Sequence, residues 1–208
     1  MKPPLVVILV LCVLSSIEAL TYRYFAYGSN MVASTLTALR QVHPISASAA
    51  ILPDYRLRFN IGGMDLVDGA AASVQACSGE QVHGVVYELT PKDFARVGST
   101  EGVPLAYRWA KCRVYPYVGD GDSAGKRARE TNKAVMAYTL VNSSPRDLLP
   151  SRSYLDLLIQ GAEEWKVDRT YSDKLKATPV ARNLLVPDGL AGLALKLAEL
   201  RQTKCDYG

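Results

Sequence analysis

The sequence predicts an α+β fold built on one mixed, closed sheet. Segments that alternate apolar and polar residues, as strands do, recur between residues 22 and 141. Helical patterns with capping residues follow the strand patterns at Thr90 and Ser151. With 208 residues, of which 49% are hydrophobic, the chain is long enough to bury the core of a single domain.

The first strand is predicted over residues 22–27, where aromatic residues alternate with others. It ends at Gly28-Ser29-Asn30, and residues 31–40 carry apolar side chains at helical spacing. A strand that breaks here and enters a helix leaves backbone N–H groups pointing outward. Such groups suit an anion or a developing oxyanion. The same three residues can also serve as an ordinary strand–turn–helix junction.

The middle of the chain is predicted to be strand-rich. Strands are expected over residues 47–52 and 55–59, with a turn at Pro53-Asp54 and a loop over residues 60–69. A hairpin is expected from residues 70–76 and 82–89 around Ser78-Gly79-Glu80.

The second half of the chain mixes helices with strands. Thr90 should cap a helix that has Pro91 in its first turn. Strands are predicted over residues 107–118 and 134–141, around a mobile connector at 119–133. Ser151 should cap a helix with Tyr154, Leu155, Leu158, Ile159 and Ala162 on one face. Further helical stretches are expected at 171–175 and 190–201.

Three segments, in order, resemble the γ-glutamylcyclotransferase family. They are Phe25-Ala26-Tyr27-Gly28-Ser29-Asn30-Met31; residues 82–89 followed by Glu101-Gly102-Val103 and Tyr107; and residues 137–140 followed by Pro150-Ser151-x-x-Tyr154 and Gly161-Ala162-x-Glu164. The matches cover roughly residues 22–175. The resemblance implies a small β-barrel flanked by helices. It also implies a lyase that converts γ-glutamyl amino acids or amines to 5-oxoproline plus the free amino acid or amine.

The resemblance assigns the catalytic role to Glu101. Cyclotransfer needs one group that takes a proton from the attacking amine and returns it to the departing one. Such a carboxylate should be partly desolvated, and the neutral residues at 98–100 and 102–104 predict few charges nearby. Without the resemblance, Glu101 would be interpreted as an exposed loop residue. Glu88 is the competing acid, in a strand whose neighbours look structural.

The resemblance places the glutamyl head on the loop formed by Gly28, Ser29 and Asn30, with Tyr27 beside it. It also implies that Tyr107, Tyr138 and Tyr154 lie near the substrate, although each is equally acceptable as a core residue. Asn30 argues against the glutathione-preferring relatives, which usually carry Tyr-Gly-Ser-Leu. The leaving group is otherwise left open.

No cofactor is expected. The cysteines lack zinc-site spacing and the chain has only His43 and His83, so a metal is not expected either. His83 is interpreted as packing at a strand edge. The run Lys126-Arg127-Ala128-Arg129 adjoins a Gly- and Asp-rich segment and indicates a solvated loop, not a nucleic-acid patch. The expected partner is a small γ-glutamyl substrate, and a homodimer is left open.

The first nineteen residues have the layout of a secretory signal peptide. Lys2 precedes an apolar stretch over residues 5–14, and Ala19 offers a cleavage point. The expected product is a secreted domain over residues 20–208, with no membrane attachment after cleavage. A secreted non-catalytic binding or effector protein that keeps the fold is the alternative function.

The secretory interpretation affects the cysteines and one asparagine. Cleavage removes Cys12 and leaves Cys77, Cys112 and Cys205, an odd number whose pairing the sequence leaves open. Asn142-Ser143-Ser144 is a glycosylation sequon, so Asn142 is a predicted glycosylation site.

Overall fold

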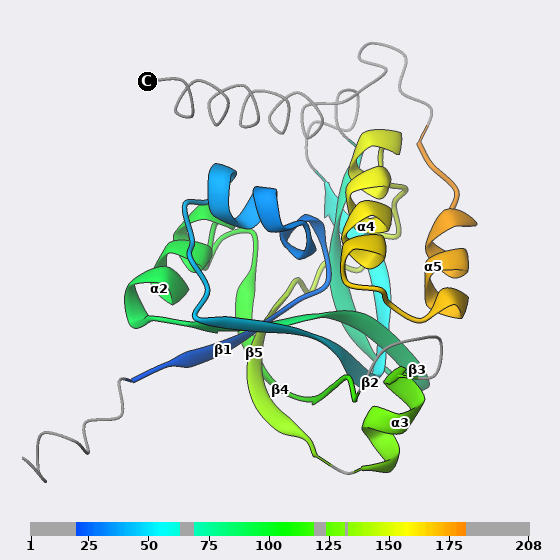
Figure 1. Cartoon of the computed structure of the whole chain (residues 1–208). Helices are drawn as coiled ribbons and strands as arrows, with labels where there is room; N and C mark the ends of the chain where they lie inside the picture. Colours follow the sequence, from blue (N-terminus) through cyan, green and yellow to red (C-terminus); the bar gives the residue numbers. More distant parts are fainter. Residues whose placement is uncertain (1–19, 63–68, 119–123, 132, 182–208) are drawn as a thin grey trace, which may run out of the picture.

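The computed structural model describes residues 20–62, 69–118, 124–131 and 133–181. Five strands form a closed barrel in the order β1-β3-β2-β4-β5 (Figure 1), which confirms the predicted mixed, closed sheet. The strands are β1 (Tyr22–Ala26), β2 (Ser46–Gly62), β3 (Ala70–Leu89), β4 (Arg108–Pro116) and β5 (Val135–Val141). β1 and β5 pair in parallel, and the other pairs are antiparallel.

β2 and β3 are long continuous strands, so the turns predicted at Pro53-Asp54 and around Gly79 are wrong. Asp54 and Gly79 have positive φ values of 59° and 82°, as turn residues often do. The Gly79 N–H donates to Asp54 Oδ1 at 3.0 Å, beside a register shift between Pro53 and Tyr55. These residues therefore bend two paired strands together instead of ending them. Of the loop expected at 60–69, β2 occupies the start as far as Gly62, and residues 63–68 lie outside the described residues.

The barrel closes tightly where β1 meets β3. Phe25, Ala26 and Val85 are fully buried at this junction. A Cβ added to Gly84 would lie 2.1 Å from the Ala26 carbonyl oxygen, so only glycine fits at this position of β3. This close approach fixes the end of β1, from which the Gly28 turn departs.

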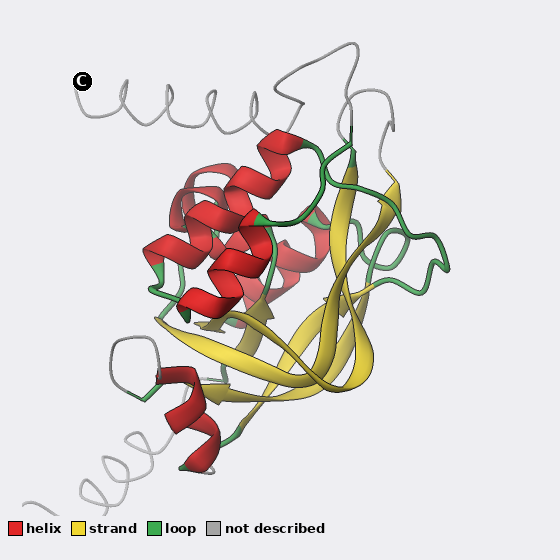
Figure 2. Ribbon diagram, turned by 90° about the vertical axis from the view of Figure 1, so that its right-hand side faces the viewer, coloured by secondary structure: helices red, strands yellow, loops and turns green. Residues whose placement is uncertain are grey.

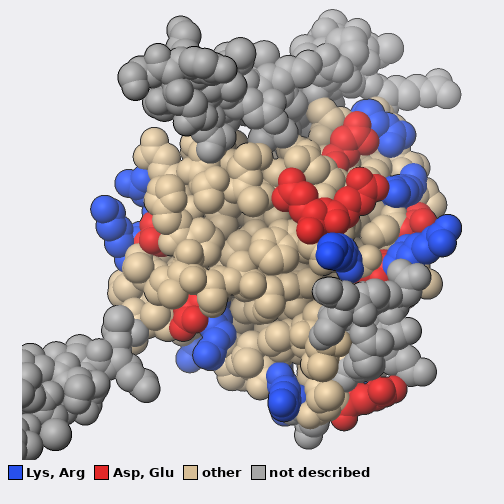
Figure 3. Space-filling view, viewed as in Figure 1, with Lys and Arg blue, Asp and Glu red and all other residues tan. Residues whose placement is uncertain are grey.

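Most of the helices gather on one side of the barrel, and α3 lies apart from them (Figure 2). The elements are the 3₁₀ turn η1 (Ser29–Met31), the π-helical turn η2 (Thr35–Leu39), α2 (Pro91–Thr100), α3 (Ala124–Glu130), α4 (Arg152–Glu164) and α5 (Arg169–Lys176). In Figure 3, acidic side chains collect where α4 and α5 lie, and much of the remaining face is uncharged.

Both predicted helix caps are confirmed. Thr90 Oγ1 accepts from the Asp93 N–H at 3.1 Å, and Ser151 Oγ accepts from the Tyr154 N–H at 3.1 Å. The helix predicted over 31–40 is confirmed in part: residues 33–39 are helical and include η2, whereas Met31 belongs to the separate 3₁₀ turn η1. The connector at 119–133 contains α3, and the helix expected at 190–201 lies outside the described residues.

His83 lies in β3 opposite Ile51 of β2, two residues beyond Val85, where the pairing of β3 with β1 ends. It is 1% exposed and stacks on Tyr171 with ring centroids 4.6 Å apart. Burial lowers the pKa of His83 to about 4, so the ring is neutral near pH 7. Its environment is that of a packing residue.

Cys77 and Cys112 are free thiols, one half-buried and one buried. Cys205 lies outside the described residues. In the part of the chain that the structure describes, no helix has the length and apolar character needed to cross a bilayer.

Candidate active site

Two aromatic side chains anchor the turn from Gly28 to Met31 through hydrogen bonds to its carbonyl groups. The Tyr87 hydroxyl donates to the carbonyl oxygens of Asn30 and Met31 at 3.0 and 3.2 Å. Trp165 Nε1 donates to the Met31 carbonyl at 2.8 Å. Helix α4 can approach this closely because of Gly161, where a Cβ would lie 2.6 Å from Met31 Cβ. The turn is therefore fixed by β3 and α4 together.

Two backbone donors of this turn remain available. The N–H groups of Met31 and Val32 donate within the turn, to Gly28 and Ser29 carbonyls at 2.9 and 3.1 Å. Those of Ser29 and Asn30 have no acceptor among the residues that the structure describes. Adjacent free N–H groups of this kind can bind a carboxylate or stabilise an oxyanion.

Glu101 lies immediately after α2, where its own N–H still bonds the Val97 carbonyl at 3.0 Å. Its side chain is 12% exposed. Asn30 Nδ2 donates to Glu101 Oε1 at 2.9 Å, and Arg40 Nη2 lies 2.7 Å from the same oxygen. Oε2 accepts no hydrogen bond from any described residue. The carboxylate is thus held by one oxygen, and the other is free.

The expectation of few charges near Glu101 is wrong, because Arg40 pairs with it. Arg40 Nη1 also donates to the Thr100 carbonyl at 2.9 Å, and Arg40 Nε donates to Asn30 Oδ1 at 3.2 Å. Sequence reasoning missed this residue. Arg40 ends the segment of helical spacing after Asn30, 61 positions before Glu101, and nothing in that pattern predicts the pairing.

Three tyrosine hydroxyls complete the polar wall of the site. Tyr107 donates to the Ala72 carbonyl at 2.8 Å, and Tyr154 accepts from the Ala72 N–H at 3.0 Å. Tyr27 donates to the Leu140 carbonyl. Burial raises the pKa of Tyr27 and of Tyr107 well above its ordinary value, so both hydroxyls stay protonated.

These side chains enclose one small pocket. It is lined by Tyr24, Tyr27, Gly28, Ser29, Asn30, Ala72, Glu101, Tyr107, Leu140 and Tyr154. Seven of the residues predicted to form the site are therefore together. Tyr24 was missed; its hydroxyl accepts from Asn30 Nδ2 at 3.0 Å. The pocket has a volume of about 20 Å³, which is the space of a water molecule or two, so a larger ligand requires side chains to move.

Tyr138 does not line this pocket, so the structure does not bring it together with the other predicted site residues. Its ring packs against Phe94 and Tyr22, with centroids 5.3 and 6.1 Å apart, and Lys111 Nζ lies 5.7 Å from its centroid. Glu88 also lies elsewhere, at a half-buried position of β3, where it accepts hydrogen bonds from the Thr21 and Ser46 hydroxyls; these hydrogen bonds lower its pKa.

Asn142 lies outside the pocket as well. Its Nδ2, the atom to which a glycan would attach, donates to the Ala106 carbonyl at 2.6 Å. Its Oδ1 accepts from the Ser144 N–H at 2.7 Å. The side chain therefore bridges two loops in the folded protein.

Comparison with known proteins agrees with this geometry. The model of the AIG2-like family matches residues 81–175, which include Glu101, Tyr107 and Tyr154. The γ-glutamyl cyclotransferase verK of Clonostachys rogersoniana is 32% identical over 124 residues, which are 51% of this chain and 69% of that protein. The γ-glutamylcyclotransferase of Mus musculus is 29% identical over 163 residues, covering 77% of this chain and 80% of that one.

A solved structure of a γ-glutamyl cyclotransferase has the same fold. It superposes with a TM-score of 0.69 at 21% identity, covering 87% of this chain and 99% of that one. The closed barrel and its carboxylate-lined pocket define a cyclotransferase-like protein. The chain belongs to the γ-glutamylcyclotransferase family.

Proposed function

We propose that this protein is a γ-glutamyl cyclotransferase that converts γ-glutamyl amino acids or amines to 5-oxoproline and the free amino acid or amine. The observation that carries the proposal is the state of Glu101. Its carboxylate is fixed through Oε1, while Oε2 accepts no hydrogen bond from a described residue, and Glu101 lines the same pocket as Ser29 and Asn30, whose N–H groups have no described acceptor. Family membership supports the same reaction class.

In the first step, the free α-amino nitrogen of the substrate attacks its own γ-carbonyl carbon. The new C–N bond closes a five-membered ring, the carbonyl π electrons move to oxygen, and the amine loses a proton to Glu101 Oε2. A general base must lie within hydrogen-bond reach of the proton that it takes. Oε2 suits this role because it has no competing donor among the described residues.

In the second step, Oε2 returns the proton to the departing nitrogen. The original C–N bond then breaks, the oxyanion collapses to a lactam carbonyl, and Glu101 is a carboxylate again. No water is consumed, so a pocket that excludes water favours ring closure over hydrolysis. Glu101 serves as both base and acid.

The N–H groups of Ser29 and Asn30 supply the electrostatic part of the proposal. They suit either the substrate α-carboxylate or the oxyanion that forms at the γ-carbonyl. Gly28 allows the ligand to approach the backbone, and Tyr27, Tyr107 and Tyr154 surround it. We expect Tyr154 to move on binding, because its hydroxyl stands over Gly28, 3.0 Å from the position of an added Cβ.

We also propose that the protein is secreted, with residues 1–19 as a signal peptide and Asn142 as a glycosylation site. A secreted cyclotransferase would act on extracellular γ-glutamyl compounds. The alternative, a secreted binding protein that keeps the fold without turnover, is favoured by one observation, the pocket volume of about 20 Å³.

An assay of the chain from residue 20 separates the two functions. The protein is incubated with γ-glutamyl-alanine, γ-glutamyl-ε-lysine and glutathione, and 5-oxoproline is measured by mass spectrometry. We expect 5-oxoproline from γ-glutamyl-alanine, from γ-glutamyl-ε-lysine or from both, and less from glutathione. Absence of 5-oxoproline with all three, from folded protein, would reject the enzyme and leave the binding protein.

A further inference from the structure

A second cavity is lined by residues of β2, β3, β4 and β5 and of the loop after β5. None of these residues lines the candidate active site. Its volume is about 360 Å³, at the small end of the range for small-molecule sites. The floor is apolar, formed by Val74, Ala76, Ala110 and Val141. Hydroxyl and amide groups stand around it, from Tyr55, Gln75, Ser143 and Ser144.

The charge of this cavity has one sign. Arg58 from β2 and Arg108 from β4 both line it, and no Asp or Glu is among its lining residues. Two guanidinium groups without an acid in the same cavity form a positive field that a small anion would neutralise.

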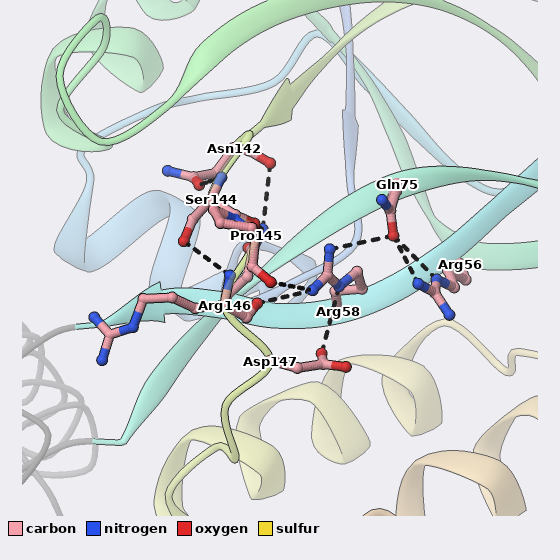
Figure 4. Close-up of polar contacts among 9 residues, drawn as sticks. Arg56, Arg58, Gln75, Asn142, Ser144, Pro145, Arg146 and Asp147 are labelled. Carbon is pink, nitrogen blue, oxygen red and sulfur yellow. Dashed lines mark hydrogen bonds and ion pairs between the residues drawn. The ribbon is translucent and has the colours of Figure 1, made fainter.

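Arg58 is a well-anchored residue of the cavity wall, and its side chain is only 11% exposed. Figure 4 shows how it is held: Nη1 donates to Gln75 Oε1 at 3.2 Å, and Nη2 donates to the Arg146 and Pro145 carbonyls at 2.8 and 3.4 Å. Its one acidic partner, Asp147, is 3.4 Å from Nε and 77% exposed. Such an exposed contact neutralises little charge.

Arg56, which is not among the residues that line this cavity, shares a hydrogen-bond acceptor with Arg58. Its Nε and Nη2 donate to Gln75 Oε1 at 3.1 and 2.8 Å, beside the bond from Arg58 (Figure 4). Three N–H donors from two cations therefore converge on one neutral amide oxygen. This oxygen satisfies hydrogen bonds without cancelling charge.

The Arg108 side chain is exposed, and it makes no hydrogen bond or ion pair with another described residue. Its five N–H donors are available to a ligand. Arg108 follows Tyr107, and Val141 follows Leu140, so the two cavities back onto each other along β4 and β5.

We propose that this cavity binds a small molecule with a carboxylate or phosphate group, which lies between Arg58 and Arg108 while the rest of the molecule packs on the apolar floor. The free guanidinium group of Arg108 can pair with either anion through two parallel hydrogen bonds, so the shared chemistry is an oxyanion with at least two free oxygens. Most Arg58 donors are already bonded, so Arg58 contributes mainly its positive charge. The volume restricts the ligand to a few carbon atoms beside that group.

The test is calorimetric titration with two probes, inorganic phosphate and succinate, at constant ionic strength set with chloride. We expect at least one probe to bind the wild type, and the better probe identifies the preferred anion. Arg108→Gln should weaken binding about 10-fold to 100-fold, as expected for lost hydrogen bonds to a charged group. Ala76→Leu, at an exposed floor position, should weaken it by filling the cavity without changing charge.

The matched control is Arg113→Gln, which removes the same charge from an exposed position on β4 outside the cavity. It should bind like the wild type. Absence of binding to the wild type with either probe would overturn the proposal, as would equal weakening by Arg108→Gln and Arg113→Gln. Gly28→Val, which blocks the active-site turn, should bind both probes normally; loss of binding in this variant, with folding checked by circular dichroism, would assign the anion to the active-site pocket and reject the second site.

Discussion

Arg40 Nη2 and Asn30 Nδ2 both contact Oε1 of Glu101, at 2.7 and 2.9 Å, and Oε2 is left without a described donor. The two carboxylate oxygens of Glu101 therefore have different roles. One is held by charge-assisted bonds that fix the carboxylate plane. The other accepts no hydrogen bond from a described residue, and we assign the proposed proton transfer to it.

We expect Arg40→Gln to lower kcat about 10-fold to 100-fold, with a smaller change in KM. The variant loses the ion pair that orients Glu101 but leaves the glutamyl-binding turn in place. Steady-state rates over a range of substrate concentrations measure both parameters.

Arg96→Gln is the matched control for Arg40, because Arg96 is a half-buried arginine of α2 that donates to Gln41 instead of Glu101. It should keep the wild-type kcat and KM. Millimolar guanidinium should partly restore an Arg40→Ala variant. If the Arg40 variants lost stability but kept kcat, Arg40 would be a structural residue only.

Substitutions in the turn distinguish a backbone cradle from a serine nucleophile. Ser29→Ala should change kcat less than about fivefold, because the N–H does not depend on the side chain. Gly28→Val should abolish measurable turnover, because its Cβ would already lie 3.0 Å from the Tyr154 hydroxyl and its methyl groups would displace that ring. Gly28 has φ −113°, so the cause is contact and not a left-handed backbone.

The measurements are the rates of both variants on one γ-glutamyl substrate, with circular dichroism to check folding. A Ser29→Ala enzyme as inactive as Glu101→Gln would count against the cradle. A covalent glutamyl adduct of the wild type, detected by mass spectrometry, would likewise favour a serine nucleophile over the backbone cradle.

His83 should make stability depend on pH. Its pKa is lowered by burial from 6.5 to about 4, so the unfolded chain binds a proton before the folded chain does. Its contribution is therefore fully present above pH 6.5 and is lost as pH falls from 6.5 to about 4. Between pH 6.5 and about 4, the free energy of unfolding of the wild type should fall by up to about 1.4 kcal/mol per pH unit more than that of His83→Gln. Urea unfolding at pH 7 and pH 5 measures the difference, and parallel loss in both proteins would contradict it.

Secretion has a direct chemical test. N-terminal sequencing of the protein from its natural source should start near Leu20. An intact Met1 on soluble cytosolic protein would contradict export. Glycosylation of Asn142 would have to precede folding, since Nδ2 bonds the Ala106 carbonyl at 2.6 Å in the folded chain. Peptide mass mapping before and after glycosidase treatment shows whether the residue is modified.

Local sequence patterns predicted much of the fold. The caps at Thr90 and Ser151 depend on residues within one helical turn, and both are confirmed. The predicted turns at Pro53-Asp54 and Gly79 failed because the two sites face each other across paired strands. A left-handed residue in one strand is a turn signal when considered alone, but pairing converts it into a shared bend.

The residues of the candidate site likewise divide into those that local motifs predicted and those that depend on tertiary packing. The Gly28–Asn30 turn and Glu101 were found through motifs, and the structure brings them together. Arg40 was missed because its contact with Glu101 depends on how the segment after Asn30 packs against the end of α2, and Tyr138 is the one predicted substrate-binding residue that lies outside the pocket. Tyr138 lies on β5 beside Leu140, yet its ring joins the stack with Phe94 and only Leu140 reaches the pocket.

The central claim is that Glu101 transfers the proton in cyclisation, and Glu101→Gln tests it most directly. Glutamine keeps the shape of the side chain but cannot take and return the proton. We expect 5-oxoproline formation to fall by about 10²-fold to 10⁴-fold or more, while near-ultraviolet circular dichroism and substrate affinity stay close to the wild type. A folded Glu101→Gln protein that kept more than half of the wild-type rate would contradict the claim.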